Sequence, residues 1–469
     1  MMNRFLCALC FCAALLHWAC KEDLPTHRIS GTIIDAYSKE PIPNVSVNLL
    51  EDGPTVSTDA NGKFQFENAS VEENHTVQIA GRNNGAVAIS HPDYYPAEGN
   101  VAFDQPSELT LSPRSIPAYF YHQPVHLNDG LTTSTLSEAG FDSQLIHNMM
   151  DKVIRADFNQ IHSILVYKDG NLALEEYFYG NNDTIKFEEN VTVDRTPDHI
   201  QWSRKDPHYV ASVNKALTST ILGIALAQNE ISVDEKISDY LPQYATYFEN
   251  DNTGSLDFED CLTMTAGFQW DEWSSNDLSL LWKSDDFGAF VLSRTNLGPG
   301  SEWRYNSALP NLMLKAVDNM VGGNVRDWAH DNFYAKLGIE NYKWQSQPDG
   351  YPEGSARMYL TPRDMLKIGI TYLNDGQWAG EQIIPQAWVQ ACMNVKEETS
   401  SGDYSYHFWL RELNGTTYLS ADGDGGNYIN IFPDEDMVIV ITQGLYLQWP
   451  NYVVQANEMM GDFILPAIE

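Results

Sequence analysis

The chain has 469 residues, 43% of them hydrophobic, and is long enough for at least two folded domains, because single cores rarely grow beyond about 250–300 residues. Its 28 Lys and Arg residues against 64 Asp and Glu residues give a formal net charge of −36. This balance argues against nucleic acid as a partner, since phosphate binding requires clustered basic residues. We interpret the acidity as a property that keeps the chain soluble at a cell surface.

The first twenty residues have the pattern of an export signal. Arg4 supplies a charged start, and the apolar run at 5–16 is too short to cross a bilayer as a stable helix. Ala19 before Cys20 resembles a bacterial lipoprotein cleavage site, and the charged residues that follow resemble the surface-export tag of some Bacteroidetes lipoproteins. We therefore expect a signal peptide over 1–20 and a lipid anchor on Cys20. The exported chain would lie at the bacterial outer membrane, exposed at the surface or facing the periplasm; ordinary secretion with cleavage nearby is the alternative.

Residues 21–26 are predicted to be a linker, and residues 27–112 a small all-β sandwich. Apolar residues alternate with polar ones at 45–49, the period-two pattern of a half-buried strand. Asn-Gly at 61–62 predicts a type I′ hairpin turn, whose two central positions both need positive φ. The stretches "ISGTIIDAYSKEPIPNVSV" and "TDANGKFQF" resemble the carboxypeptidase-regulatory-like module of exported bacterial proteins. That resemblance implies a spacer or a docking surface for a surface partner, without chemistry of its own.

Prolines at 113–130 indicate a second linker, and a larger domain is expected over 131–469. Its predicted elements are a hairpin of Ser163–Tyr167 and Leu172–Phe178, a long apolar helix near Ala216–Ala227, and returning strands at Tyr428–Phe432 and Val438–Gln443. Strands at both ends around a helical middle predict an α/β (α+β) fold, in which one antiparallel sheet takes strands from both ends of the domain. Cys261 and Cys392, the two cysteines outside the signal, are expected to be buried free thiols.

The candidate nucleophile is Ser212, in the single Ser-x-x-Lys of the chain, Ser212-Val213-Asn214-Lys215. Residues three apart share one face of a helix, so Lys215 can reach the Ser212 hydroxyl. A serine hydroxyl becomes a good nucleophile when a neighbouring base takes its proton, and a helix N-terminus favours the negative charge that develops. The structural alternative is an ordinary helix start with Ser212 as the cap.

The surrounding sequence resembles the class C β-lactamases and their esterase and amidase relatives over about residues 130–469. The segments that carry the resemblance are "SVNKALTSTILGIALAQNEISVDEKISDYLPQY", "LTMTAGF", "LGPGSEWRYNSALPNLML" and "YLTPRDMLKIGITYLNDGQWAGEQIIPQAWV", in that order. The resemblance implies the serine β-lactamase/D,D-peptidase-like fold: an antiparallel sheet flanked by helices, with an all-helical region. It also implies a second motif at Tyr305-Asn306-Ser307, in which Tyr305 and Lys215 act jointly as the base and Ser307 lines the substrate site.

The resemblance aligns Asp424-Gly425-Gly426 with the family's third motif, where relatives carry Lys-Thr-Gly or His-x-Gly. The glycines would let a substrate approach the strand, and the Asn427 amide would join that of Ser212 in an oxyanion hole. Asp424 departs from the cation that relatives use to bind a substrate carboxylate. An acid there predicts a neutral or cationic ester or amide as the substrate, and disfavours a β-lactam or a peptide C-terminus.

These patterns together predict an exported serine hydrolase that forms an acyl-enzyme on Ser212. No cofactor or metal is expected, and the partners expected are a small or peptide-like ester or amide, with membrane contact through the lipid anchor alone. Two alternatives remain open: a β-lactamase or D,D-carboxypeptidase of peptidoglycan, and a surface binding protein that keeps the fold without turnover.

Overall fold

The computed structural model describes residues 26–35, 38–49, 54–70, 77–79, 82–94, 97–111, 113, 119, 121, 123–124, 127, 129–187, 192–195 and 199–469. The predicted signal peptide, Cys20 and most of both predicted linkers lie outside these residues.

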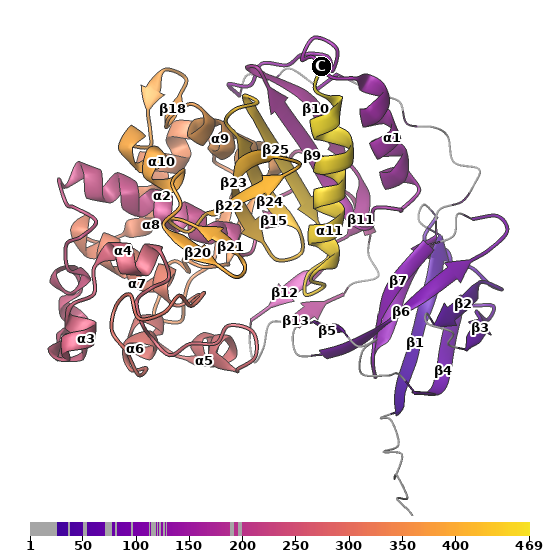
Figure 1. Ribbon diagram of the computed structural model, residues 1–469, viewed down its shortest axis with the longest axis horizontal. Helices are drawn as coiled ribbons and strands as arrows, with labels where there is room; N and C mark the ends of the chain where they lie inside the picture. The colour runs from indigo at the N-terminus through magenta and orange to yellow at the C-terminus, as the bar shows by residue number, and fades with distance from the viewer. Residues whose placement is uncertain are drawn as a thin grey trace, which may run out of the picture.

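The N-terminal part of the described chain is all-β, as predicted (Figure 1). One sheet has the order β4 (Lys63–Ser70), β1 (Thr26–Asp35), β8 (Pro106–Leu111), and the other has the order β3 (Thr55–Ser57), β2 (Ser46–Leu49), β6 (Arg82–Ser90), β5 (Val77–Ile79), with β7 (Ala97–Ala102) also paired to β6. Val45, Val47 and Leu49 are buried while their polar neighbours are less so, which confirms the predicted alternation. These side chains pack in a small core between the sheets.

The turn at Asn61-Gly62 differs from the prediction. Gly62 has a φ of +69°, but Asn61 stays outside the positive-φ region, so the turn is not type I′. The strands on either side do not form a hairpin either, because β3 pairs with β2 and β4 pairs with β1. The turn instead connects the two sheets, and the Asp59 carboxylate stabilises it by accepting hydrogen bonds from the amides of Asn61 and Lys63.

The larger domain is built on an eight-stranded antiparallel sheet with strands from both of its ends, as the sequence predicted. The strand order is β10 (Asn171–Tyr177), β9 (Ile161–Lys168), β25 (Met437–Gln443), β24 (Asn427–Phe432), β23 (Thr416–Gly423), β22 (Trp409–Leu413), β21 (Gly402–Tyr404), β20 (Glu397–Thr399). The predicted strand pairs at 163–178 and 428–443 fall within β9, β10, β24 and β25, which confirms them.

Helices cover both faces of this sheet (Figure 1). Alternate side chains of β25 point to opposite sides: Met437, Ile439 and Ile441 pack with α1 (Ser143–Ile154) and α11 (Asn451–Glu458), whereas Val438 and Val440 pack with α2 (Val213–Gln228) and α9 (Pro362–Leu373). A strand that is buried on both faces has a continuous run of apolar residues in its sequence, as β25 does. The predicted long helix is α2, and it is buried along almost its whole length.

The helical region lies at one end of the sheet (Figure 1), and short two- and three-stranded sheets lie outside the main sheet. Its helices are α3 (Asp251–Gly254), α4 (Phe258–Leu262), α5 (Asp277–Lys283), α6 (Phe287–Leu292), α7 (Leu309–Met320) and α8 (Val325–Ala329), with α10 (Gln386–Cys392) near β20. The short strands are β11 (Tyr179–Asn181), β12 (Thr184–Lys186), β13 (Thr192–Asp194), β14 (His199–Gln201), β15 (His208–Tyr209), β16 (Lys343–Trp344), β17 (Met358–Leu360), β18 (Gln377–Trp378) and β19 (Glu381–Gln382). Cys261 and Cys392 are buried and unbridged, as expected.

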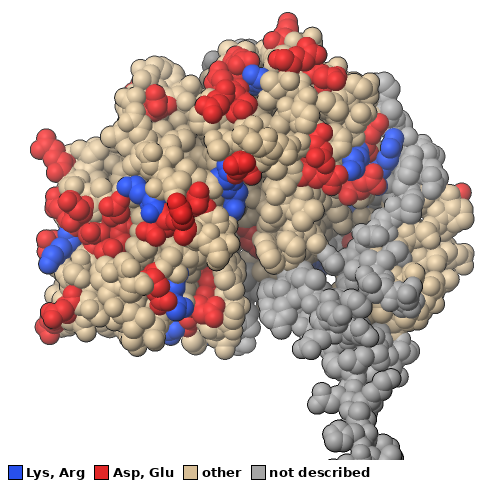
Figure 2. All heavy atoms as spheres, in the orientation of Figure 1, with Lys and Arg blue, Asp and Glu red and all other residues tan. Residues whose placement is uncertain are grey.

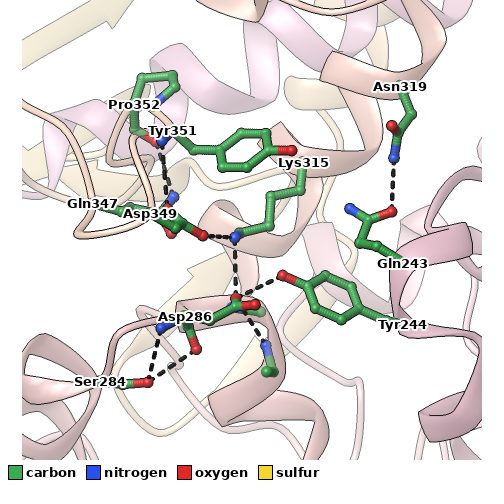
Figure 3. A network of polar contacts seen from close by, with 12 residues as sticks. Gln243, Tyr244, Ser284, Asp286, Lys315, Asn319, Gln347, Asp349, Tyr351 and Pro352 are labelled. Atoms are coloured by element: carbon green, nitrogen blue, oxygen red, sulfur yellow. Dashed lines mark hydrogen bonds and ion pairs between the residues drawn. The ribbon is translucent and has the colours of Figure 1, made fainter.

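A buried lysine on α7 holds the helical region together (Figure 3). Lys315 is 1% exposed, and its ammonium bonds to the carboxylates of Asp286, which precedes α6, and of Asp349, in the loop after β16. Tyr244 also donates to Asp286, at 2.6 Å, and the Tyr351 ring lies 4.4 Å from the ammonium. This network fixes the helix that begins directly after the Tyr305–Ser307 motif.

The surface of the larger domain follows the acidic composition. Figure 2 shows acidic side chains spread over the visible face, with fewer basic ones between them. Among the residues described here, none of the helices combines the length and apolar character that a membrane crossing requires.

Candidate active site

Ser212 lies at the point where the short strand β15 turns into the buried helix α2. The preceding residue, Ala211, has a φ of +48°, a conformation that non-glycine residues adopt rarely. Ser212 itself occupies the position before the first helical residue, yet its side chain makes no capping hydrogen bond. The capping alternative is therefore wrong, and the hydroxyl is available for another partner.

That partner is Lys215. Its Nζ lies 2.9 Å from Ser212 Oγ and also donates to the Ser355 carbonyl at 3.2 Å. Lys215 is 1% exposed, so its amine is buried beside a partly accessible hydroxyl. An ammonium has three N–H groups, and these two bonds leave one for a further acceptor. The predicted contact between the two motif residues is present.

Tyr305, the third residue of the predicted catalytic group, lies beside Lys215. The Lys215 ammonium lies 4.8 Å from the centre of the Tyr305 ring, so Lys215 contacts both Ser212 and Tyr305. The Tyr305 ring stacks with Trp273 at 5.8 Å and with Trp409 at 6.0 Å between ring centres. Trp273 is 72% exposed, so a large aromatic surface is open to solvent directly beside the candidate base.

Ser307 is tied to a carboxylate that the sequence did not single out. Its hydroxyl donates a short hydrogen bond to Glu272 Oε1, and its amide donates to Glu272 Oε2 at 3.2 Å. The indole of Trp270 also donates to Oε2, at 2.7 Å. Burial raises the pKa of Glu272, while the nearby Lys215 and the hydrogen bonds from Ser307 and Trp270 act in the opposite direction.

The segment 262–268 is adjacent to the Tyr305 motif in space. The amide of Arg304 donates to the Met264 carbonyl at 2.9 Å, and the amide of Asn306 approaches the Met264 sulfur at 3.3 Å. The backbone of the following loop then brings Glu272 and Trp273 into the site. This pairing brings together two stretches that lie about forty residues apart in the sequence.

The third motif lies in the turn between β23 and β24, where the Asp424 carboxylate bonds to a neighbouring loop. The Asp424 carboxylate accepts a hydrogen bond of 3.0 Å from the amide of Leu447, in the loop after β25. Burial raises the pKa of Asp424, and the backbone amides of Leu447 and Gly425 counteract this rise. The carboxylate thus stabilises its own turn, and its repulsion of an anionic substrate stays a prediction.

The geometry of the turn explains why positions 425 and 426 are both glycine. Gly425 and Gly426 have φ values of +82° and +92°. A Cβ on Gly425 would lie 2.3 Å from the Tyr446 ring, and one on Gly426 would lie 2.5 Å from Gln443. The space beside them is filled by protein, so they permit the tight turn and do not open the strand to substrate, as had been expected. The Asn427 side chain donates to the Asp424 carbonyl at 3.0 Å, and the oxyanion role of its amide stays a prediction.

The end of β23 extends beyond its pairing with β22. Its pairing with β22 begins at Trp409 and Ser420, whereas its pairing with β24 continues to Gly423 and Asn427. A Cβ on Gly423 would lie 2.2 Å from the Val210 carbonyl, so this end of the strand packs against the loop that carries Ser212. Backbone groups on such an edge can hydrogen-bond an extended ligand.

The site therefore combines the Ser212 hydroxyl and the buried Lys215 amine with the Tyr305 phenol. Trp273, Tyr305 and Trp409 form an aromatic wall beside them. In the part of the chain that the structure describes, no cluster of three or more His, Cys, Asp or Glu side chains could hold a metal ion. Such a set can transfer a proton from Ser212 and attack a carbonyl. Sequence reasoning missed Glu272, Trp273 and Trp409. The run "QWDEW" directly after "LTMTAGF" was the signal for the first two, because it places an acid between tryptophans beside a recognised motif.

Comparisons with known proteins agree with this geometry. The family model described as Beta-lactamase matches residues 155–447, more than half of the chain, and the model described as Carboxypeptidase regulatory-like domain matches residues 28–112. A 6-aminohexanoate-dimer hydrolase of Paenarthrobacter ureafaciens is 23% identical over 272 residues, which cover 52% of this chain and 67% of that protein.

Two solved structures show the same fold. A putative 6-aminohexanoate-dimer hydrolase from Bacillus anthracis superposes with a TM-score of 0.52 and 18% identity, covering 66% of this chain and 81% of that one. A class C beta lactamase from Rhodobacter sphaeroides gives a TM-score of 0.51 and 15% identity, covering 69% of this chain and 99% of that one.

Proposed function

Because this chain belongs to the beta-lactamase family, we propose that it is a serine hydrolase that cleaves an ester or amide bond through an acyl-enzyme on Ser212. The observation that carries the proposal is the 2.9 Å contact between Lys215 Nζ and Ser212 Oγ, made by a serine that does not cap its helix. A serine and a lysine with a purely structural role would have no reason to meet in this way beside an exposed aromatic wall.

In the first step, the Ser212 hydroxyl loses its proton to the Lys215–Tyr305 pair, and Ser212 Oγ forms a bond to the substrate carbonyl carbon. Negative charge develops on the carbonyl oxygen, close to the N-terminus of α2, where the helix dipole favours an anion. When the carbonyl reforms, the bond to the leaving alcohol or amine breaks and the leaving group takes the proton. The product is an ester between Ser212 and the acyl group.

In the second step, water replaces the leaving group. The same Lys215–Tyr305 pair accepts a proton from the water, which attacks the ester carbonyl, and the Ser212 oxygen leaves with that proton. The acid is released and the serine is restored. The aromatic wall of Trp273, Tyr305 and Trp409 suits an apolar or planar group next to the scissile bond.

The substrate that we propose is a neutral or cationic ester or amide. Residues 423–427 carry no Lys, Arg or His, so this turn lacks the cation that would attract a substrate carboxylate. The 6-aminohexanoate-dimer hydrolase to which the chain is similar is named for an amide-containing dimer, which makes amides the first compounds to screen.

The test is labelling of the purified chain with a fluorophosphonate probe, followed by mass spectrometry of the peptides. We expect the label on Ser212, no label in Ser212→Ala, and strongly reduced labelling in Lys215→Ala. Melting curves of the three proteins separate loss of reactivity from loss of folding. A folded wild-type chain that takes up no label would contradict the proposal and favour a binding protein without turnover, and rapid hydrolysis of nitrocefin would favour a β-lactamase.

We also propose that the chain is exported and lipidated on Cys20, a residue outside those that the structure describes. Incorporation of a clickable fatty acid in a bacterial host, abolished in Cys20→Ala, is the expected result. Equal incorporation in both proteins would contradict the lipid anchor.

A further inference from the structure

Glu272 is the one buried carboxylate bonded directly to a predicted site residue in the described part of the chain, and the mechanism above does not use it. It lies in the loop between α4 and α5, and 8% of the residue is exposed. Its partners are the Trp270 indole, the Ser307 amide and the Ser307 hydroxyl. Two of these are donors that can never accept, because an indole N–H and a backbone N–H have no lone pair to offer.

This arrangement restricts where a proton can sit. Oε2 faces both obligatory donors, so a proton on Glu272 can occupy Oε1 alone, where Ser307 Oγ is the partner. When Glu272 is ionised, the Ser307 hydroxyl donates to it and the Ser307 oxygen is left as an acceptor. When Glu272 is neutral, the carboxyl donates to Ser307, and the Ser307 proton must turn toward another acceptor. The charge of Glu272 therefore sets the hydrogen-bonding polarity of Ser307.

The charged groups around Glu272 favour the ionised form and depend on it. Lys215 of α2 is the cation whose electrostatic interaction with Glu272 opposes the pKa-raising effect of burial. Other titratable groups that face this region are Tyr305, Tyr404 of β21, His407 and Asp422. A buried ammonium without a nearby anion is costly, so an ionised Glu272 stabilises Lys215 in its charged form.

We propose that Glu272 is a positioning residue of the active site, which holds Ser307 as a hydrogen-bond acceptor through its own negative charge. The inference rests on the proposed serine hydrolase function and assigns a role that the family motifs do not contain. Ser307 then offers lone pairs to an N–H of the substrate.

Glutamine is a sharp probe of this idea because it copies the neutral form. The Gln side-chain oxygen can accept from Trp270 and the Ser307 amide, and its NH₂ group can donate to Ser307 Oγ. Glu272→Gln should therefore fold normally, lose the charge and reverse the polarity of Ser307 in one step. Glu272→Asp is the matched control, since it keeps the charge but withdraws the carboxylate from Ser307.

The experiment measures the rate of Ser212 labelling by the fluorophosphonate across about pH 5–10 for the wild type and both variants, with melting curves for each. For Glu272→Gln we expect labelling about ten- to a hundredfold slower, the size of one lost charge-assisted hydrogen bond. The acid limb of its pH profile, where the labelling rate falls at low pH, should also move to lower pH, because the variant removes a negative charge from the site. Glu272→Asp should be slower with its limb unmoved.

The inference would be overturned if folded Glu272→Gln had the labelling rate and the acid limb of the wild type. It would also be overturned if the variant were labelled more slowly but its acid limb did not move, because that result indicates a purely structural role. If the wild type itself is not labelled at Ser212, the proposed function fails, and the inference fails with it.

Discussion

Replacing Lys315 by methionine is expected to destabilise the catalytic domain by about 3 kcal/mol, because the change leaves two carboxylates without their shared cation. Methionine keeps much of the apolar stem of lysine, so that the loss of charge dominates. Removing one partner of a buried ion pair costs about 3–5 kcal/mol. Here Lys315 is 1% exposed, but the side chains of Asp286 and Asp349 are 37% and 20% exposed, so water can partly compensate both anions.

Asp286 also keeps other partners after this change. The Tyr244 hydroxyl and the amides of Gly288 and Ala289 still donate to it. Burial would raise the pKa of Asp286, but its hydrogen bonds from Tyr244, Ala289 and Lys315 outweigh burial and hold the pKa below its usual value. These remaining bonds place the expected cost near the lower end of the range for buried pairs.

The assay is thermal or urea unfolding of the wild type, Lys315→Met and the control Lys336→Met. Lys336 pairs with Glu381 on the surface, where the two side chains are 36% and 60% exposed. Exposed pairs contribute about 0–1 kcal/mol, so the control should unfold almost as the wild type does. Equal stability of the two variants would refute the reasoning, because burial of the Lys315 charge would then have no energetic consequence.

Two further predictions address the site and the pH dependence of stability. Trp273→Ala should lower kcat/KM about two- to tenfold for aromatic acyl esters relative to acetyl esters, the size of one aromatic stacking contact. Its melting temperature should stay nearly unchanged, since the indole is 72% exposed. Leu280→Ala, on neighbouring α5, is the control, and an equal loss of kcat/KM for both esters would mean that Trp273 supports Tyr305 instead. Burial, and then the charges of His208 and His199, hold the pKa of His162 well below its usual value. Because this folded-state pKa is depressed, the neutral ring contributes stability that is complete above the unfolded pKa of about 6.5 and is lost as the pH falls below it. His162→Phe should therefore reduce the acid-side slope of the unfolding free energy by up to about 1.4 kcal/mol per pH unit, and an unchanged slope between the two proteins would contradict this account.

Much of the fold could be predicted from local patterns because each pattern expresses a local or repetitive physical rule. The apolar runs of β9, β24 and β25 and the apolar α2 were recognisable, since elements buried on both faces carry few polar residues. The hairpin predicted at Asn61-Gly62 was wrong because a turn sequence specifies the bend of the chain and not the sheet in which the next strand pairs.

The residues of the site also fall into two groups: those that the sequence predicted and those that only the tertiary structure brought together. Ser212 and Lys215 are three residues apart on one helix, so helical geometry alone predicts their contact, and the sequence by itself determined the nucleophile and its neighbour. Their relation to Tyr305, ninety residues later, was implied by a resemblance and became a contact when α2 packed against α7. The direction of the Asp424 side chain depends on Leu447, which joins the turn only because β23 and β25 flank β24 in one sheet. Only the tertiary structure placed Glu272 against Ser307 and Trp409 against Tyr305, because long-range packing brings those residues together and no local pattern encodes it.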